Sequence, residues 1–320
     1  MRENSIIEAA EAGLSKEQAL SLLEEDTGTL VCAAGEVRSR FCGSHFELCT
    51  IINSKSGKCS EDCRYCAQSA HYPSDTECYD MLSAEEVSAC AVSNEKAGVE
   101  RFSIVTSGRT LSDCETDKLC GIVRTLKQNT TLSLCSSNGL LKYNQLKKLY
   151  EAGITRYHCN METSESFFPS ICTTHTYQDK KDTIAAAQKA GMSICSGGII
   201  GLGESFEDRI DLAFTLKEIR ADSIPLNILN PIPGTPLAGQ PSLSEEEIVR
   251  TAALFRLILK DKTIRLAGGR TLLADKGRLA VRAGVNAMIS GDMLTTAGIR
   301  TMEDIHMVKE LGFETGRENK

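Results

Sequence analysis

Apolar residues along this chain form short β-type runs that alternate with longer segments of helical period. The runs are rich in β-branched residues, and the longer segments repeat apolar positions every three or four residues. The predicted strands are 47–52, 101–106, 131–136, 154–161, 193–198, 222–229, 263–267 and 287–289. The predicted helices are 83–97, 112–128, 142–152, 176–190, 205–220, 243–258 and 273–283.

Polar and glycine residues at the ends of these segments support the helix assignments. Ser83 and Ser244 each precede glutamates in the pattern of an N-terminal cap. Gly153, Gly191 and Gly284 follow the last apolar position of three predicted helices, where a left-handed residue commonly ends a helix. These signals define the boundaries of the alternating elements.

Strands that alternate with helices predict a parallel sheet, and eight such units close as a (β/α)8 barrel of the α/β class. Apolar positions at helical spacing within 5–25 predict short amphipathic helices before the barrel. We therefore expect an N-terminal helical extension over residues 1–40 and a TIM-type barrel domain over residues 41–320. In such a barrel the active site lies at the carboxyl ends of the strands.

Composition narrows the possible environments. The formal net charge of −7 disfavours nucleic-acid binding, which usually needs a basic face. No apolar run reaches the roughly 18–20 residues that cross a bilayer, so we expect no membrane segment. Fourteen cysteines behind an N-terminus without an apolar signal region indicate a reducing cytoplasm rather than a disulfide framework.

Cys59, Cys63 and Cys66 form a C-x-x-x-C-x-x-C motif after the first predicted strand, with Tyr65 before the last cysteine. Three thiolates in one loop can hold three irons of a [4Fe–4S] cluster and leave the fourth iron open for a substrate or cofactor. A structural zinc site needs a second cysteine pair, and none follows at a suitable spacing. The motif favours the cluster; structural zinc and buried thiols are the alternatives.

The fourth and fifth strands carry features of a ligand site. His158, Asn160 and Glu162 alternate along strand four, so they share a face, and polar groups inside a barrel need a polar partner such as ribose. The glycine-rich run 196–205 lets a flat adenine approach the backbone beside Ile199; a plain turn is the alternative.

Further chemistry is predicted inside the barrel. Cys49, Cys135 and Cys195 lie on strands one, three and five, and Arg265 lies on a later strand. Odd-numbered strands contribute to shared interior layers, so these residues together predict a second cluster. Each cysteine taken alone is more typical of a hydrophobic core residue. On strand six, the amide of Asn227 could pair with a ureido or amide group.

Together these residues resemble the radical S-adenosylmethionine (SAM) enzymes, and among them the biotin synthase family. The resemblance runs from about residue 45 to 312 and includes a C-terminal part associated with biotin and thiamin synthesis. It is carried by the cysteine motif and by five further stretches, 160–164, 173–177, 195–204, 233–237 and 293–296.

The resemblance implies roles for particular residues. Cys59, Cys63 and Cys66 would hold the [4Fe–4S] cluster whose open iron binds SAM. Asn160 and Asn227 would also face the ureido ring of dethiobiotin. The residues implied in SAM binding are Tyr65, Thr106, Asn160, Glu162, His175, Ile199 and Asn230.

The chain departs from the family pattern at its second cluster, the auxiliary cluster that donates sulfur. Cys135, Cys195 and Arg265 match the family's ligands, but the strand-two position is Ser103. We expect Cys49 on strand one to replace the missing ligand, with Cys159 as the other candidate, and the cluster could then contain four irons rather than the usual [2Fe–2S]. His175 stands where an arginine is expected to meet the SAM carboxylate, and Glu162 replaces a shorter aspartate.

The function implied by the resemblance is sulfur insertion into dethiobiotin to give biotin, with SAM cleaved at the first cluster. The implied partners are a low-potential electron donor such as flavodoxin or ferredoxin and a second copy in a homodimer. One alternative is another radical SAM enzyme of the same barrel type, such as a hydrogenase maturase or methylornithine synthase. The other is a non-catalytic iron–sulfur carrier or sensor.

Overall fold

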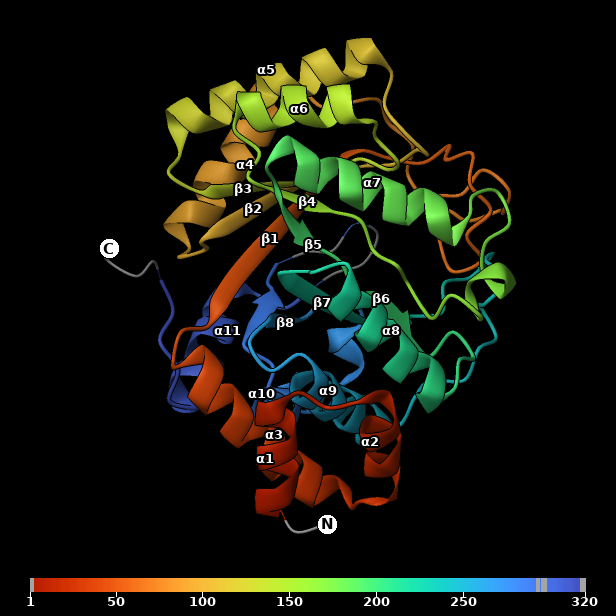
Figure 1. The fold of residues 1–320 in the computed structure, drawn as a ribbon. Helices are drawn as coiled ribbons and strands as arrows, with labels where there is room; N and C mark the ends of the chain where they lie inside the picture. The colour runs from red at the N-terminus through yellow and green to blue at the C-terminus, as the bar shows by residue number, and fades with distance from the viewer. Residues whose placement is uncertain (1–2, 292–293, 295–297, 317–320) are drawn as a thin grey trace.

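A computed structural model describes residues 3–291, 294 and 298–316, and Figure 1 shows their fold. Within this part, nine parallel strands follow the order β5-β4-β3-β2-β1-β9-β8-β7-β6, and a β5–β7 pairing closes the sheet into a barrel. The strands are β1 (Glu47–Lys55), β2 (Arg101–Thr106), β3 (Ser133–Ser137), β4 (Arg156–His158), β5 (Ser193–Cys195), β6 (Gly198–Ile200), β7 (Ser223–Ile228), β8 (Thr263–Leu266) and β9 (Ala287–Ile289).

The strands β5 and β6 are two pieces of one barrel strand. Cys195 at the end of β5 pairs with Ser223, the first residue of β7, and β6 pairs with β7 further along. The predicted strand 193–198 is therefore interrupted after Cys195, and the eight-position parallel barrel is confirmed. Strand four is shorter than its predicted range of 154–161, since regular pairing ends at His158.

Helices surround the barrel, as Figure 1 shows. Six are close to their predicted ranges, whereas α10 is much shorter than 273–283 and α11 was not predicted. None of the described helices has both the length and the apolar character that a membrane crossing needs. The outer helices are α4 (Ala84–Lys96), α5 (Asp113–Asn129), α6 (Tyr143–Ala152), α7 (Tyr177–Ala190), α8 (Phe206–Glu218), α9 (Glu245–Ile258), α10 (Arg278–Arg282) and α11 (Thr301–Glu310).

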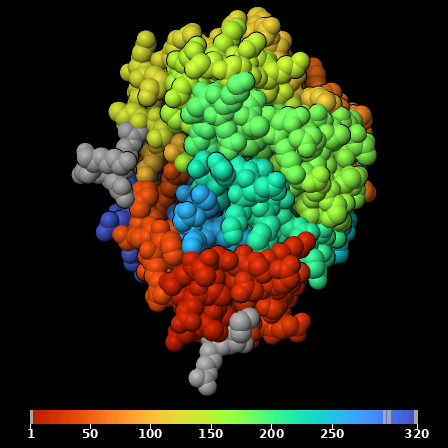
Figure 2. Space-filling view, viewed as in Figure 1, coloured from red at the N-terminus to blue at the C-terminus, as the bar shows by residue number. Residues whose placement is uncertain are grey.

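The N-terminal extension consists of α1 (Glu3–Ala12), α2 (Lys16–Ser21) and α3 (Thr27–Cys42). These helices lie together at one end of the molecule, and Figure 2 shows them as a red to orange layer. Helix α3 packs on α9 and continues two residues past the expected boundary at residue 40. Its buried side chains join the core of the barrel.

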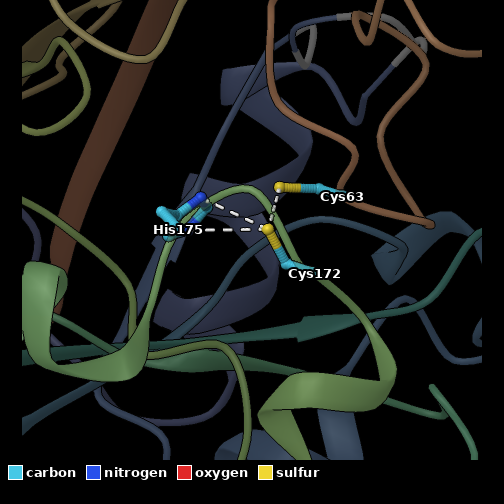
Figure 3. A group of neighbouring side chains, drawn as sticks. All are labelled: Cys63, Cys172 and His175. Carbon is cyan, nitrogen blue, oxygen red and sulfur yellow. Dashed lines mark hydrogen bonds between the residues drawn. The ribbon is translucent and has the colours of Figure 1, made fainter.

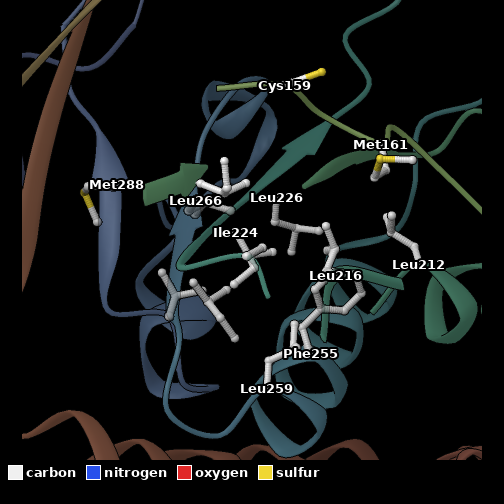
Figure 4. Close-up of a cluster of buried hydrophobic side chains, with 14 of the residues drawn as sticks. Cys159, Met161, Leu212, Leu216, Ile224, Leu226, Phe255, Leu259, Leu266 and Met288 are labelled. Atoms are coloured by element: carbon white, nitrogen blue, oxygen red, sulfur yellow. The ribbon is translucent and has the colours of Figure 1, made fainter. Parts of the chain in front are cut away.

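The core between the barrel and its helices includes Cys159 and Met161, as Figure 4 shows. Cys159 is 8% exposed, and Met161 is fully buried. Alternation along this segment predicts that both side chains point away from the barrel interior, toward the helices. Their place in this apolar cluster agrees with that prediction and makes Cys159 a core residue.

Candidate active site

A cavity of about 440 Å³ occupies the inside of the barrel and reaches the loops that follow the strands. Its walls come from every part of the sheet, because inward side chains alternate along each strand. Most of the site residues predicted from the sequence line it. They are Cys49, Cys59, Tyr65, Cys66, Thr106, Cys135, Asn160, Glu162, Cys195, Ile199, Asn227, Asn230 and Arg265.

The three interior cysteines and Arg265 all face this cavity, and all four are buried. The sheet register explains how they come together. Cys135 on β3 pairs with Ser103 on β2, so the serine lies directly beside a predicted cluster ligand. Cys195 on β5 pairs with His158 on β4, which also lines the cavity.

Glu47 forms ion pairs with three arginines that line the same cavity. Its carboxylate accepts hydrogen bonds from Arg265, from Arg101 at 3.3 Å and from Arg156 at 3.4 Å. Burial alone would raise the pKa of Glu47, but Arg265, Arg101 and Arg156 together lower it to about 2. Glu47 is therefore ionised and fixes the Arg265 guanidinium at the cavity wall.

The buried thiols differ in how readily they lose a proton. Burial raises the pKa of Cys49 to about 11. Burial also raises the pKa of Cys135, to about 12, and the neighbouring thiols of Cys195 and Cys49 contribute to that rise. Burial acts on Cys195 too, but His158, whose Nδ1 lies 3.3 Å from the sulfur, lowers the pKa of Cys195 to about 7. Three soft sulfur donors that line one cavity fit an iron–sulfur cluster, since thiolates are its normal ligands.

The cysteine loop follows β1 and is held by backbone hydrogen bonds. The Cys66 amide donates to Cys63 O at 2.9 Å, and the Cys59 amide donates to Gln68 O at 2.9 Å. Cys59 and Cys66 line the cavity, whereas Cys63 contacts Cys172 from the loop after β4. The sequence predicted that the motif lies at the carboxyl end of β1, and the structure agrees.

Asn160 and Glu162 lie just beyond β4 at the mouth of the cavity. Asn160 accepts a hydrogen bond from the Gly197 amide at 3.0 Å and donates to Glu162 at 3.3 Å. Glu162 has a φ of 75°, an unusual backbone value for a non-glycine residue, and its backbone pairs with Gly198. The end of β4 is thus irregular, and this geometry aims both polar side chains at one place.

Asn227 lies on β7 with its amide already bound to the backbone. It donates to Gly198 O at 3.0 Å and accepts from the Gly268 amide at 2.9 Å. Because a side-chain amide has two N–H groups, one donor stays available to a ligand in the cavity. The backbone contacts hold the amide in one orientation.

His175 is the predicted SAM-binding residue that the structure does not bring to the cavity wall. Its Nδ1 lies 2.5 Å from Glu61 Oε2 and 3.2 Å from Cys172 Sγ. Its imidazole contacts these neighbours and is not part of the cavity lining. Of the stretch 293–296, only Leu294 is among the described residues, and it lines the cavity.

Sequence reasoning missed four polar residues at or near the site, namely Glu47, Arg101, Arg156 and Cys172. For the first two the signal was present, since Glu47 lies two positions from Cys49 and Arg101 two from Ser103 on predicted strands. A charged residue on the buried face of a strand needs a partner. Nothing in the local pattern shows that Cys172 meets Cys63, which lies 109 residues away.

Two family models match successive parts of the chain. Residues 53–216 match the radical SAM superfamily, and residues 225–314 match the biotin and thiamin synthesis associated domain. The first match contains the cysteine loop and most of the cavity residues, and the second contains Asn227, Asn230 and Arg265.

Among solved structures, methylornithine synthase superposes with a TM-score of 0.84 at 18% identity, covering 99% of this chain and 98% of that one. HydG, a maturase of the [FeFe]-hydrogenase, superposes with a TM-score of 0.83 at 17% identity, covering 98% of this chain and 75% of that one. At such low identity these likenesses establish the barrel fold alone.

Curated relatives are much closer in sequence. The biotin synthase of Clostridium botulinum strain Hall is 58% identical over 301 residues, which cover 94% of this chain and 95% of the relative. The biotin synthase of Akkermansia muciniphila is 49% identical over 300 residues, or 94% of each chain. Since these alignments span nearly the whole of both proteins, the chain belongs to the biotin synthase family of the radical SAM superfamily.

Proposed function

We propose that this chain converts dethiobiotin to biotin by radical insertion of a sulfur atom. The observation that carries the proposal is the lining of one cavity. Cys59 and Cys66 of the cysteine loop line it, and so does a second set of thiols beside Arg265. A substrate held between the two sets could lose hydrogen on one side and receive sulfur on the other. An iron–sulfur carrier or sensor would not need that enclosed space.

Cys59, Cys63 and Cys66 would hold a [4Fe–4S] cluster that binds SAM at its open iron. When bound, this cluster and SAM supply a carbon-centred radical that removes hydrogen atoms from unactivated C–H bonds. The protein must then keep the reacting atoms close and exclude water. The enclosed, largely apolar barrel interior suits both tasks.

Six cavity residues would position SAM. The carboxylate of Glu162 and the amide of Asn160 are suited to ribose hydroxyls, and Ile199 offers an apolar surface to the adenine. Tyr65 lies beside Glu162, and burial together with that carboxylate raises the pKa of Tyr65, so its hydroxyl stays protonated as a donor. Thr106 and Asn230 complete the set. His175 lies outside the cavity lining and is not part of this set.

The auxiliary cluster would be held by Cys49, Cys135, Cys195 and Arg265. Cys49 is the better replacement for the missing strand-two cysteine, because it lines the cavity while Cys159 lies in the apolar core. Three cysteines also suit a four-iron cluster whose fourth iron carries the sulfur to be transferred. Mössbauer spectra of anaerobically reconstituted protein test this point, and a second site made only of [2Fe–2S] would exclude it.

Asn160 and Asn227 would bind the ureido ring of dethiobiotin. The free N–H of Asn227 can donate to the ureido oxygen, since its other polar atoms are held by backbone groups. A low-potential donor such as flavodoxin or ferredoxin would supply electrons. We further propose that the protein forms a homodimer and that residues 1–40 are a helical extension of the barrel. We also propose that it resides in the cytoplasm, where 14 free cysteines stay reduced.

An anaerobic assay of the reconstituted protein with dethiobiotin, SAM and a low-potential reductant tests the function. Mass spectrometry should find biotin together with about two 5′-deoxyadenosines per product. The Cys195→Ser variant should still cleave SAM but make no biotin, whereas Cys114→Ser, at an exposed site, should behave as wild type. Deoxyadenosine without biotin from the wild-type protein would overturn the proposed substrate and favour another radical SAM activity.

A further inference from the structure

Cys63, Cys172 and His175 converge where the loop after β1 meets the loop after β4, as Figure 3 shows. The two sulfurs lie 3.7 Å apart. From Cys172 Sγ, His175 Nδ1 lies at 3.2 Å and Nε2 at 3.9 Å. Cys172 and His175 are 3% and 8% exposed. The donor set is two thiols and an imidazole from two distant segments.

These separations fit the edges of a tetrahedral zinc site. With Zn–S near 2.3 Å and Zn–N near 2.0–2.1 Å, the tetrahedral angle puts two sulfurs about 3.8 Å apart and sulfur about 3.6 Å from nitrogen. The observed distance between the two sulfurs is within about 0.1 Å of the expected sulfur–sulfur edge. The distances from Cys172 Sγ to the two imidazole nitrogens, 3.2 Å and 3.9 Å, lie on either side of the expected sulfur–nitrogen edge. The two sulfurs are therefore already spaced for an ion, and the imidazole must turn to present Nε2, because Nδ1 is the nitrogen nearer Cys172 Sγ.

Glu61 contacts the imidazole at Nδ1, the nitrogen that also lies nearer Cys172 Sγ. Its Oε2 lies 2.5 Å from His175 Nδ1, and the same oxygen accepts a hydrogen bond from Thr174 Oγ1 at 2.8 Å. When the Nδ1–H group donates a hydrogen bond to this carboxylate, Nε2 keeps an unprotonated lone pair that can bind an ion. A carboxylate behind a metal-binding histidine is the usual outer partner in protein metal sites.

Packing holds the remaining groups in place. Asp62 Oδ1 accepts from the Cys172 thiol at 3.3 Å and from the Thr173 amide at 2.8 Å, which ties the two loops together. The Phe168 ring meets the His175 ring edge-on, with centroids 5.5 Å apart. Three protein ligands would leave the fourth position to water.

We propose that the cluster-free protein binds one divalent transition-metal ion of the zinc type through Cys63 Sγ, Cys172 Sγ and His175 Nε2, with Glu61 as the outer partner of the histidine. Binding replaces the two thiol protons, which pass to solvent, and leaves two metal–thiolate bonds. On the proposed function, Cys63 is also a ligand of the SAM cluster, so the ion and that cluster exclude each other. The site thus keeps a cluster ligand occupied until the cluster is built.

Cobalt(II) is the probe, because tetrahedral thiolate-bound Co²⁺ absorbs visible light and Zn²⁺ displaces it. The full-length, cluster-free protein is titrated anaerobically under reducing conditions. The decisive background is Cys59→Ala/Cys66→Ala, which removes the other two loop thiols. In it, one Co²⁺ should still bind with a charge-transfer band of thiolate ligation, and one equivalent of Zn²⁺ should remove the band.

Single changes in that background separate the ligands. Cys172→Ser or His175→Asn should weaken Co²⁺ binding at least about a hundredfold, and Glu61→Gln should weaken it about 10–100-fold. Cys114→Ser, at an exposed position, is the matched control and should change nothing. Loss of binding in the Cys59→Ala/Cys66→Ala background, or unchanged binding after Cys172→Ser, would overturn the proposal. The titration uses neither SAM nor dethiobiotin, so it is independent of the biotin assay.

Discussion

Glu47 is a single residue on which the charge balance of the barrel interior depends. It is the carboxylate that meets Arg101, Arg156 and Arg265, and its side chain is 17% exposed. Buried guanidinium groups stay charged because an arginine does not lose its proton at ordinary pH. Removal of the carboxylate would therefore leave positive charge buried without a partner, which is more costly than the loss of a surface pair.

Glu47→Gln should lower the free energy of unfolding of the cluster-free protein by about 3 kcal/mol. The amide keeps the size of the side chain, so the loss reports on charge rather than on packing. Urea unfolding followed by circular dichroism measures it. Glu36→Gln breaks an exposed pair with Arg40 and should cost less than about 1 kcal/mol. Equal losses in the two variants would contradict this account.

The pKa of Glu47 also predicts how stability depends on pH. A carboxyl group whose pKa falls from 4.5 in the unfolded chain to about 2 in the folded one stabilises the fold above pH 4.5. That contribution shrinks as the pH falls toward 2, by about 2 kcal/mol at pH 3. The stability gap between wild type and Glu47→Gln should therefore narrow between pH 5 and pH 3. A gap that stays constant over this range would show that Glu47 does not titrate as described.

At the scale of the element, the break between β5 and β6 shapes the ligand side of the cavity. A Cβ on Gly197 would lie 1.9 Å from Pro225 O, and one on Gly198 would lie 2.3 Å from Glu162 O. The backbone of this segment thus packs directly against two other segments. That close approach lets the Gly197 amide reach Asn160 and the Ile199 amide reach Glu162 O.

Gly197→Ala should destabilise the protein by several kcal/mol and disturb SAM binding, because the added methyl group collides with backbone that cannot turn away. Gly121→Ala is the matched control. Gly121 lies in α5 with free space around its Cα, so alanine there should stabilise the protein by up to about 1 kcal/mol. Thermal unfolding and SAM titration of the reconstituted variants measure both effects. A neutral Gly197→Ala variant would refute the packing argument.

At the scale of the molecule, α9 connects the N-terminal extension to the barrel. From Ile248 to Ile258 almost every side chain of α9 is buried, as expected of a helix covered on both sides. Arg256 on this helix is fully buried and donates to Gly284 O at 2.8 Å, to Asn286 at 2.8 Å and to Cys42 Sγ at 3.2 Å. The extension therefore completes the core of the barrel.

Removal of residues 1–42 should expose the outer face of α9 and give a protein that binds hydrophobic dyes and aggregates during size-exclusion chromatography. The physical reason is the loss of an apolar cover that the barrel cannot replace. Removal of α1 alone is the control, since α1 packs chiefly on α3, and that variant should stay folded with reduced stability. A soluble residue 43–320 protein with cooperative unfolding would show that the barrel folds without its extension.

Most elements were predictable because their signals are local. The caps at Ser83 and Ser244 form as capping boxes in the structure, and Gly153 and Gly191 follow the ends of their helices. The predictions that were wrong also have physical causes. Strand four ends early because its backbone is irregular beyond His158, with a positive φ at Glu162. Strand five breaks where Gly197 and Gly198 pack against backbone, a contact that no periodicity in the sequence indicates.

The alternation of strands and helices, the closed barrel that follows from it and the loop of three cysteines can all be predicted from the amino-acid sequence, because period and spacing are properties of neighbouring residues. Tertiary packing alone revealed that Glu47 meets three arginines and that His175 joins Cys63 and Cys172. These contacts depend on sheet register and on how distant loops pack, so they connect residues that no local pattern relates.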